Sequence, residues 1–131
     1  MKAGLVAVLM FALAAPSNAQ SDGLKLWRLD CGTLDVEQQD YSDTGLYAGQ
    51  TKTFVDSCFL IRNGDRYMLW DTGVSGALAG QPKDKDGAFL KEKVTAQLAR
   101  IGVKPEAVNF VGISHYHSDH TGQVMDFTGS T

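Results

Sequence analysis

The residues best suited to chemistry lie in one short segment near the C-terminal end, residues 115–120, with the sequence HYHSDH. All three histidines of the chain fall within this segment, beside the carboxylate of Asp119. Neutral imidazoles and a carboxylate are the ligands that suit zinc and its first-row neighbours. The alternative, a polar loop whose histidines only hydrogen-bond to nearby backbone, does not account for this concentration. The segment therefore predicts a metal site.

The spacing within this segment fits two metal ions. His115 and His117 lie two residues apart, so on an extended chain they project from the same face and can hold one metal together. Asp119 and His120 are adjacent, and a bend in the chain would turn both toward a second metal. Two metals about 3.5–4 Å apart can hold a hydroxide between them and polarise a substrate oxygen. The spacing is therefore consistent with a site for two metal ions.

The pattern His-x-His-x-Asp-His resembles the signature of the metallo-β-lactamase superfamily of hydrolases. The flanking residues 111–114 (VGIS) and 121–123 (TGQ) are most similar to the N-acyl homoserine lactonase family. The similarity runs from about Leu24 to the end of the chain. This resemblance implies an α/β (α+β) fold, the N-terminal half of the four-layer αββα metallo-β-lactamase fold.

The same resemblance implies an activity and a set of site residues. The protein is expected to open the ring of an N-acyl homoserine lactone, or of a similar small-molecule lactone or ester, with a hydroxide that bridges two Zn²⁺ ions. The expected metal ligands are His115, His117, Asp119 and His120. Asp119 is also the expected catalytic residue, which passes a proton to the departing alkoxide. Manganese, iron and cobalt are alternatives to zinc.

Other functions fit the same segment. They are a metallo-β-lactamase, a thioester or phosphodiester hydrolase of the same superfamily, and a non-catalytic metal-binding protein. Further ligands of the superfamily come from downstream, but after His120 the chain has no histidine and only one aspartate, Asp126. A catalytic zinc normally has three protein ligands, and here the first metal would have two. We therefore expect residues 20–131 to be the N-terminal part of the domain, truncated at the C-terminus and inactive alone.

The segment Asp71-Thr72-Gly73 follows a strand-like run and permits three interpretations. In the superfamily, an Asp at this strand end supports the metal loop, because a carboxylate that accepts the outer N–H of a ligand fixes the ligand's orientation. The segment also resembles the strand end of aspartic proteases, in which two carboxylates share a proton. One copy would then require a dimer and would leave the histidines unexplained. The third interpretation is a simple turn, and we favour the supporting role.

The first half of the chain predicts three elements that lead up to this segment. Alternation from Leu24 to Asp30 predicts a strand. The polar residues 32–53 predict a long loop, which is either solvated or, by resemblance, borders the active site with Tyr41, Leu46 and Tyr47. Two runs, residues 54–62 and 66–70, are joined by Asn-Gly-Asp and predict a hairpin.

The second half predicts a helix and a strand. Four apolar residues share one helix face over residues 89–101, whereas Gln97 should face water and Gly102 should end the helix. These four are Leu90, Val94, Leu98 and Ile101. The apolar run from Val108 to Ile113 predicts a strand covered on both faces, which delivers His115 at its C-terminal end.

The N-terminus and the charge balance bound the location and the partners. A positive start, an apolar run from Ala3 to Ala15 and small residues up to Ala19 predict a signal peptide over residues 1–19. We therefore expect an exported protein, periplasmic or secreted, that is not in a membrane after cleavage. With 12 basic and 15 acidic residues the net charge is −3, and no basic cluster suggests nucleic acid as a partner.

Two cysteines, Cys31 and Cys58, remain to be explained. An even count in an exported protein favours a disulfide, which would stabilise the fold by about 3–4 kcal/mol. The alternative is two buried thiols that act as small apolar side chains. The spacing does not choose between them.

Overall fold

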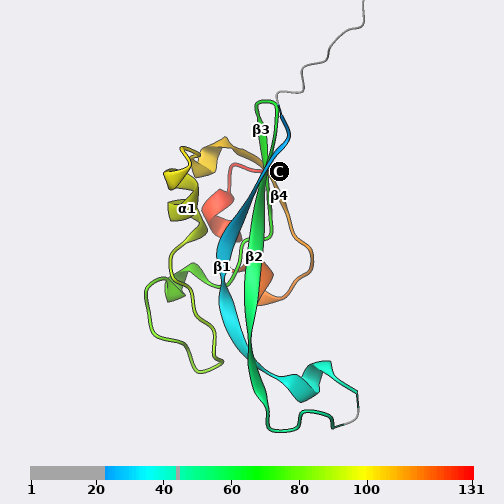
Figure 1. The fold of residues 1–131 in the computed structure, drawn as a ribbon. Helices are drawn as coiled ribbons and strands as arrows, with labels where there is room; N and C mark the ends of the chain where they lie inside the picture. Colours follow the sequence, from blue (N-terminus) through cyan, green and yellow to red (C-terminus); the bar gives the residue numbers. More distant parts are fainter. Residues whose placement is uncertain (1–22, 44) are drawn as a thin grey trace, which may run out of the picture.

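The computed structural model describes residues 23–43 and 45–131, so the predicted signal peptide lies outside the described residues. These residues form one four-stranded sheet in the order β1-β2-β3-β4 (Figure 1). β1 and β2 are antiparallel, as are β2 and β3, whereas β3 and β4 are parallel. The strands are β1 Lys25–Glu37, β2 Thr51–Asn63, β3 Arg66–Trp70 and β4 Val108–Gly112. None of the described helices is long and apolar enough to cross a membrane.

The predicted hairpin is confirmed as β2 and β3. The chain reverses at Gly64 and Asp65, between the paired residues Asn63 and Arg66. Within the turn only Gly64 has a positive φ, of 64°. A two-residue turn with a left-handed glycine in its first position matches the twist of the strands that it joins. The glycine therefore makes the turn, and Asn63 remains in the strand.

The sequence prediction is wrong about the end of the first strand. A loop is predicted over residues 32–53, but β1 continues to Glu37 and pairs with β2 throughout. A β-bulge at Cys31 shifts the register and breaks the alternation of side chains. Beyond the bulge polar side chains pair across the ribbon, and Thr53 Oγ1 donates to Asp35 Oδ1 at 2.6 Å. Residues 33–37 do alternate between polar and apolar types, with Leu34 and Val36 apolar, but Gly32 and the bulge separate this run from the first one, so the alternation is not continuous.

Helices cover one face of the sheet (Figure 1). They are α1 (Val94–Arg100) and the 3-10 helix η4 (Val124–Phe127). The core beneath them consists of Leu29, Cys31, Cys58, Leu60, Leu69, Val94, Leu98, Val103, Val108 and Phe127. The other short helices are η1 Gln38–Tyr41, η2 Gly76–Leu78, η3 Pro105–Ala107 and α2 Ser118–Thr121.

α1 is shorter than the apolar period predicts. Leu90 is buried but lies before the helix, in a bridge to Ala79, and Ile101 after the helix is 39% exposed. Gln97, which should face water, is buried. Its side-chain oxygen accepts from Asp30 N at 2.9 Å, and its amide donates to Asp30 O at 2.6 Å. Gln97 thereby satisfies backbone groups next to the bulge, a contact that periodicity within one helix cannot show.

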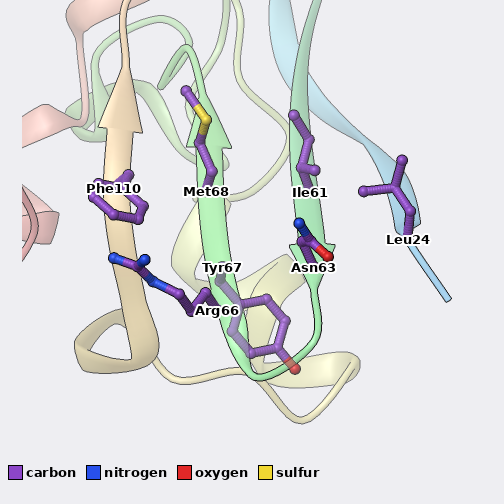
Figure 2. Close-up of a pocket in the computed structure, with 7 residues that line it drawn as sticks. All are labelled: Leu24, Ile61, Asn63, Arg66, Tyr67, Met68 and Phe110. Atoms are coloured by element: carbon purple, nitrogen blue, oxygen red, sulfur yellow. The ribbon is translucent and has the colours of Figure 1, made fainter. Parts of the chain in front are cut away.

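β4 is covered on one face only, so the prediction of two covered faces is wrong for the described residues. Val108 is buried, but Phe110 is only half-buried. On the uncovered face lies an open, mainly apolar pocket of about 290 Å³ (Figure 2). It is lined by Leu24, Ile61, Asn63, Arg66, Tyr67, Met68 and Phe110. The guanidinium of Arg66 lies 4.5 Å from the centre of the Phe110 ring.

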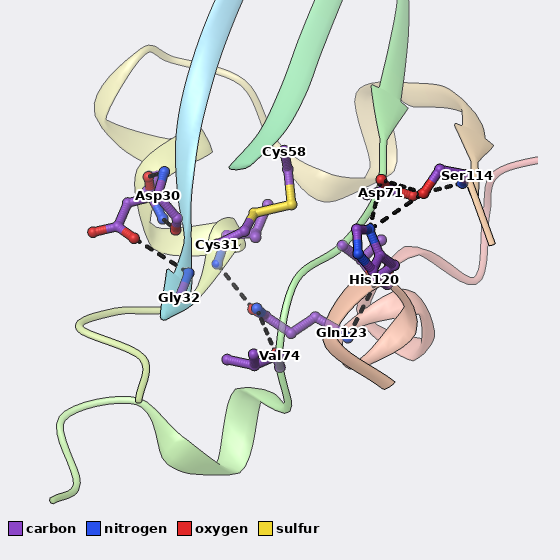
Figure 3. Close-up of a disulfide and its surroundings, with 12 residues drawn as sticks. Asp30, Cys31, Gly32, Cys58, Asp71, Val74, Ser114, His120 and Gln123 are labelled. Carbon is purple, nitrogen blue, oxygen red and sulfur yellow. Dashed lines mark hydrogen bonds and ion pairs between the residues drawn. A yellow bond between two sulfur atoms is a disulfide. The ribbon is translucent and has the colours of Figure 1, made fainter. Parts of the chain in front are cut away.

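A disulfide joins Cys31 and Cys58, whose Cα atoms lie 5.7 Å apart (Figure 3). It links β1, at the bulge, to β2, and both residues are fully buried. The carbonyl of Cys31 also accepts from Val74 N at 3.0 Å. Gly73, with a φ of 74°, packs so closely on Cys31 that a Cβ would meet the Cys31 oxygen at 2.6 Å. The crosslinked strands therefore hold the segment that follows β3.

Candidate metal centre

The predicted metal ligands lie where β3 and β4 end. Because these two strands are parallel, the chain leaves both at the same edge of the sheet. Asp71 follows β3, and its backbone N–H donates to the oxygen of Gly112, the last residue of β4, at 2.8 Å. The histidine segment follows β4 and ends in α2. The sheet therefore brings Asp71 next to residues that lie more than forty positions further along the chain.

Asp71 is 4% exposed, and its carboxylate contacts His120 of the histidine segment and Ser114 just before it (Figure 3). Its carboxylate accepts from Ser114 N at 2.7 Å and from Ser114 Oγ at 2.8 Å. The ring nitrogen Nδ1 of His120 lies 2.9 Å from Asp71 Oδ2. Burial alone would raise the pKa of Asp71, but the hydrogen bonds from Ser114 and His120 outweigh it and lower the pKa. The carboxylate therefore stays ionised and fixes the His120 ring.

The four predicted ligands lie in one cluster. The ring centres of His115 and His117 are 4.6 Å apart, and those of His115 and His120 are 4.1 Å apart. The bend that the spacing requires is the short helix α2, and in it His120 Nε2 lies 3.4 Å from Asp119 Oδ2. Within the described residues, no group of three or more His, Cys, Asp or Glu side chains is arranged to hold a metal ion. The ligand types are thus assembled without a complete coordination shell.

Backbone contacts fix α2 against the segment after β3. The oxygen of His120 accepts from Thr72 N at 2.8 Å and from Thr72 Oγ1 at 3.1 Å. Gly122 N donates to Gly73 O at 2.8 Å, and the backbone of Val74 leaves no room for a side chain at Gly122. Thr72 and Gly73 therefore have roles in positioning the histidine segment, which the aspartic-protease interpretation does not need.

Gln123 is a buried residue that joins three parts of the chain around this cluster (Figure 3). Its side-chain oxygen accepts from Val94 N at 2.9 Å, at the first turn of α1. Its amide donates to Val74 O at 3.1 Å, and its backbone N–H donates to Thr72 Oγ1 at 3.3 Å. Sequence analysis missed this role and that of Ser114, because both depend on contacts between distant segments.

Asp56 is a third residue that sequence analysis missed. It alternates with Cys58 and Leu60 along β2, and all three are buried, so its side chain faces the helix-covered side of the sheet. It lines a pocket of about 130 Å³ together with Asp119 and His120. The remaining lining residues are Leu34, Phe54 and Val55. An aspartate at an inward position of a predicted strand is a signal that the sequence does contain.

The charges around Asp56 point to a cation. Burial raises the pKa of Asp56 to about 7, and the carboxylates of Asp119 and Asp71 add to this effect, while His120 opposes it. Burial lowers the pKa of His120, but the hydrogen bond to Asp71 and the neighbouring carboxylates raise it overall. Asp56 Oδ2 has no hydrogen-bond partner within the described residues. Imidazoles, carboxylates and an unpartnered buried oxygen are a donor set that fits a divalent metal ion.

The residues expected by resemblance to border the site are not among those that line the pocket of Asp56, Asp119 and His120. Tyr41 and Tyr47 line a separate pocket of about 170 Å³ near the far end of the β1–β2 ribbon. They are 68% and 52% exposed, and Leu46 is 57% exposed. Phe54 lines this pocket and also the pocket of Asp56. Phe54 is thus shared by the two pockets.

Solved structures of N-acyl homoserine lactone hydrolases share this fold. One, with N-hexanoyl-L-homoserine bound at its catalytic metal centre, is 22% identical with a TM-score of 0.65, over 79% of this chain and 45% of its own. B. thuringiensis AiiA, with N-decanoyl-L-homoserine at its active site, is 21% identical with a TM-score of 0.66, over 80% and 46%. The dizinc lactonase AidC is 18% identical with a TM-score of 0.57, over 86% and 42%.

These likenesses confirm the predicted fold, the N-terminal half of the metallo-β-lactamase fold. The chain spans less than half the length of each of these structures. No curated protein matches it by sequence. The family model described as the metallo-beta-lactamase superfamily matches residues 52–131, a range that includes Asp71 and the whole histidine segment. On this match, the chain belongs to the metallo-β-lactamase superfamily.

Proposed function

We propose that this protein is a metal-dependent hydrolase that opens the ring of an N-acyl homoserine lactone or a similar lactone. The observation that carries the proposal is the cluster of three histidines and Asp119, with the His120 ring held by the ionised carboxylate of Asp71. Family membership supports the hydrolase class. The lactone is supported by the fold shared with lactone hydrolases. We further propose that the remaining ligands come from outside these 131 residues.

The residues of this chain have distinct roles in the proposed site. His115 and His117 would hold one divalent metal, and Asp119 and His120 a second one, with zinc as the first choice. With its proton on Nδ1 and directed at Asp71, His120 would have the lone pair of Nε2, which lies on the side of Asp119, for binding metal. Ser114 holds the Asp71 carboxylate through two hydrogen bonds and so fixes this orientation. When bound, such metals lower the pKa of water and polarise a carbonyl.

Asp119 would also transfer a proton during the reaction. Asp119 has its carboxylate beside His120 and lines two pockets, of about 130 and 100 Å³. From this position it can pass a proton to the alkoxide that leaves when the ring opens. Asp119 is therefore proposed as a metal ligand and as the catalytic residue.

Metal content of the product of the full reading frame tests the proposal. We expect about two zinc equivalents by elemental analysis, in line with a two-metal site. Replacing His115 and His117 together by Ala should remove at least one equivalent, whereas Tyr116→Phe, a matched change within the same segment, should remove none. Tyr116 is 86% exposed, so its substitution leaves the packing intact. A full-length protein without bound metal would refute the hydrolase proposal.

The substrate needs a separate assay. N-hexanoyl-L-homoserine lactone, a carbapenem, a thioester and a phosphodiester are offered to the metal-loaded protein in parallel. Turnover of the lactone with little turnover of the others supports the proposed substrate. Carbapenem turnover without lactone turnover would identify a β-lactamase, and two bound metals without any turnover would identify a binding protein.

Export is also a proposal, based on residues 1–19. Expression of the full reading frame followed by N-terminal sequencing should find a mature protein that begins at Gln20, outside the cytoplasm. A protein that keeps Met1 in the cytoplasm would show that the segment is not a signal peptide.

A further inference from the structure

Asp56 occupies a position that the histidine segment does not predict. It lies in β2, opposite Gly32 of β1, two residues from the disulfide at Cys58. The alternation of β2 turns its side chain to the same side as Cys58 and Leu60, which lie in the apolar core. Asp56 is 93% buried, with 7% of its surface exposed. A carboxylate at such a position needs a partner, because burial without one costs free energy.

The described part of the chain supplies no partner for one of its oxygens. Asp56 Oδ2 is buried and accepts no hydrogen bond there. The pocket that it lines also contains Asp119 and His120, which are two of the proposed metal ligands. Asp56 therefore lies beside the part of the cluster where a second metal would bind.

The charged groups around Asp56 offer little else for its carboxylate to pair with within the described residues. The groups that act on Asp56 are the carboxylates of Asp119 and Asp71 and the imidazole of His120. His120 already has Asp71 at Nδ1 and Asp119 at Nε2. Three carboxylates with one imidazole leave an excess of negative charge in a buried place, which a divalent cation would balance.

We propose that Asp56 belongs to the metal centre and strengthens the binding of the cation held by Asp119 and His120. The inference rests on the proposed function, since it assigns a further residue to the same site. Asp56 supplies a negative charge and an acceptor oxygen from β2, whereas Asp71 supports His120 from the end of β3. The sheet thus contributes a carboxylate to the metal centre from each of two neighbouring strands.

Zinc affinity of Asp56→Asn tests this assignment in the metal-free product of the full reading frame, reloaded in competition with a chelator. Asparagine has the same shape but no charge. We expect zinc affinity to fall about tenfold, as when other supporting carboxylates of metal sites are removed. Loading with Co²⁺ instead of zinc should also change the visible absorption spectrum, because the surroundings of the metal change.

Asp84→Asn is the matched control. Asp84 also lines a pocket with Asp119, a different one from that of Asp56, but its carboxylate already accepts from Asp86 N at 2.9 Å and from Ala88 N at 2.8 Å. Its replacement should change zinc affinity less than twofold. An equal loss in both variants would mean that only the net charge matters and would overturn the assignment of Asp56.

Thermal unfolding without metal separates this role from a structural one. If Asp56 serves the cation, the metal-free Asp56→Asn variant should melt no lower than the wild type, because an unpartnered buried charge is removed. A lower melting temperature with unchanged zinc affinity would show a purely structural residue and overturn the inference. Equal zinc affinity in the wild type and in Asp56→Asn refutes only the role of Asp56, whereas a wild type that binds no zinc refutes the proposed function as well.

Discussion

Asp71 and Asp56 are both buried beside the histidine segment, but the chain surrounds them differently. Asp71 is 4% exposed, and its carboxylate is within hydrogen-bonding distance of Ser114 N, Ser114 Oγ and His120 Nδ1. Its pKa is lowered despite burial. Asp56 is 7% exposed, has one oxygen without a partner in the described residues, and has its pKa raised to about 7 by burial and by neighbouring carboxylates.

The two carboxylates differ in the hydrogen-bond donors that the chain places around them. Burial acts on both carboxylates in the same direction, so the opposite shifts of pKa come from the donors around Asp71. Where the protein supplies all donors, the carboxylate can orient a neighbouring residue such as His120. Where one carboxylate oxygen receives no hydrogen bond from the described residues, as at Asp56, the carboxylate is suited to bind a cation that is not part of the chain.

Removing the Asp71 carboxylate, the acceptor for Ser114 and His120, should have the largest effect on stability. Asp71→Ala leaves the Ser114 amide and the His120 ring without their acceptor, and it puts alanine at a φ of 60°, which Asp and Asn tolerate better. We expect the free energy of unfolding to fall by about 3–4 kcal/mol. Asp71→Asn, which keeps an acceptor oxygen and the backbone preference, should lose less than half as much. Urea denaturation of both variants measures the difference, and equal losses would contradict it.

The disulfide supports both carboxylates, since Cys58 lies two residues from Asp56 and Cys31 holds the segment after Asp71. Its half-cystines are 27 residues apart, so replacing both by alanine should lower the free energy of unfolding by about 3 kcal/mol. Denaturation with and without a reductant measures this loss. The reductant should destabilise the wild type by a similar amount and leave the double variant unchanged. Insensitivity of the wild type would show that the crosslink contributes no stability.

Stability in the absence of metal should depend on pH in opposite ways at the two carboxylates. The folded-state pKa of Asp56 lies near 7, above its unfolded value, so the stability contributed by its proton is complete below about pH 4 and is lost as the pH rises through about 7. Asp71 has a lowered pKa, so its contribution is present above about pH 4 and is lost as the pH falls through the folded value.

Asp56→Asn removes one of the two titrating carboxylates and so isolates its part of the pH dependence of stability. At pH 8 this variant, without metal, should be more stable than the wild type by about 2–4 kcal/mol, and the difference should vanish toward pH 4. Chemical denaturation across this range provides the measurement. A constant difference between wild type and variant from pH 4 to pH 8 would contradict the raised pKa.

The smallest effect on stability is expected at Asp35, because its contacts with Lys83 and Thr53 are exposed to solvent. Its pKa is lowered first by the hydrogen bond from Lys83, at 2.5 Å, and then by that from Thr53. In Lys83→Gln we expect the pKa of Asp35 to rise toward its ordinary value, as followed by NMR, without a measurable change in the midpoint of unfolding. A clear loss of stability would show that this exposed ion pair matters more than the comparison with Asp71 suggests.

Local sequence patterns were sufficient for the main elements and for the cluster of proposed ligands. The Asn-Gly turn signal located the β2–β3 hairpin, and the apolar run located β4. The short spacing from His115 to His120 guaranteed that these side chains lie near one another, whatever the rest of the fold. Such signals need only neighbours within a few residues, which is why they can be recognised in the sequence.

Other features depend on contacts between distant segments. The bulge at Cys31 interrupts the alternation of β1, so its second half was not predicted. Gln97 is buried because it hydrogen-bonds to Asp30, 67 residues away in the sequence. Periodicity describes one element at a time and cannot show which backbone groups of another element lack a partner.

The same reason separates the two aspartates of the site. Asp71 stands in a recognisable segment at a strand end, so its role could be proposed from the sequence. Asp56 gains significance only when β2 is paired with β1 and α2 is packed beside it, which buries its carboxylate and leaves one oxygen without a donor in the described residues. The sequence specifies the ligand types, and packing specifies which carboxylates face the proposed metal.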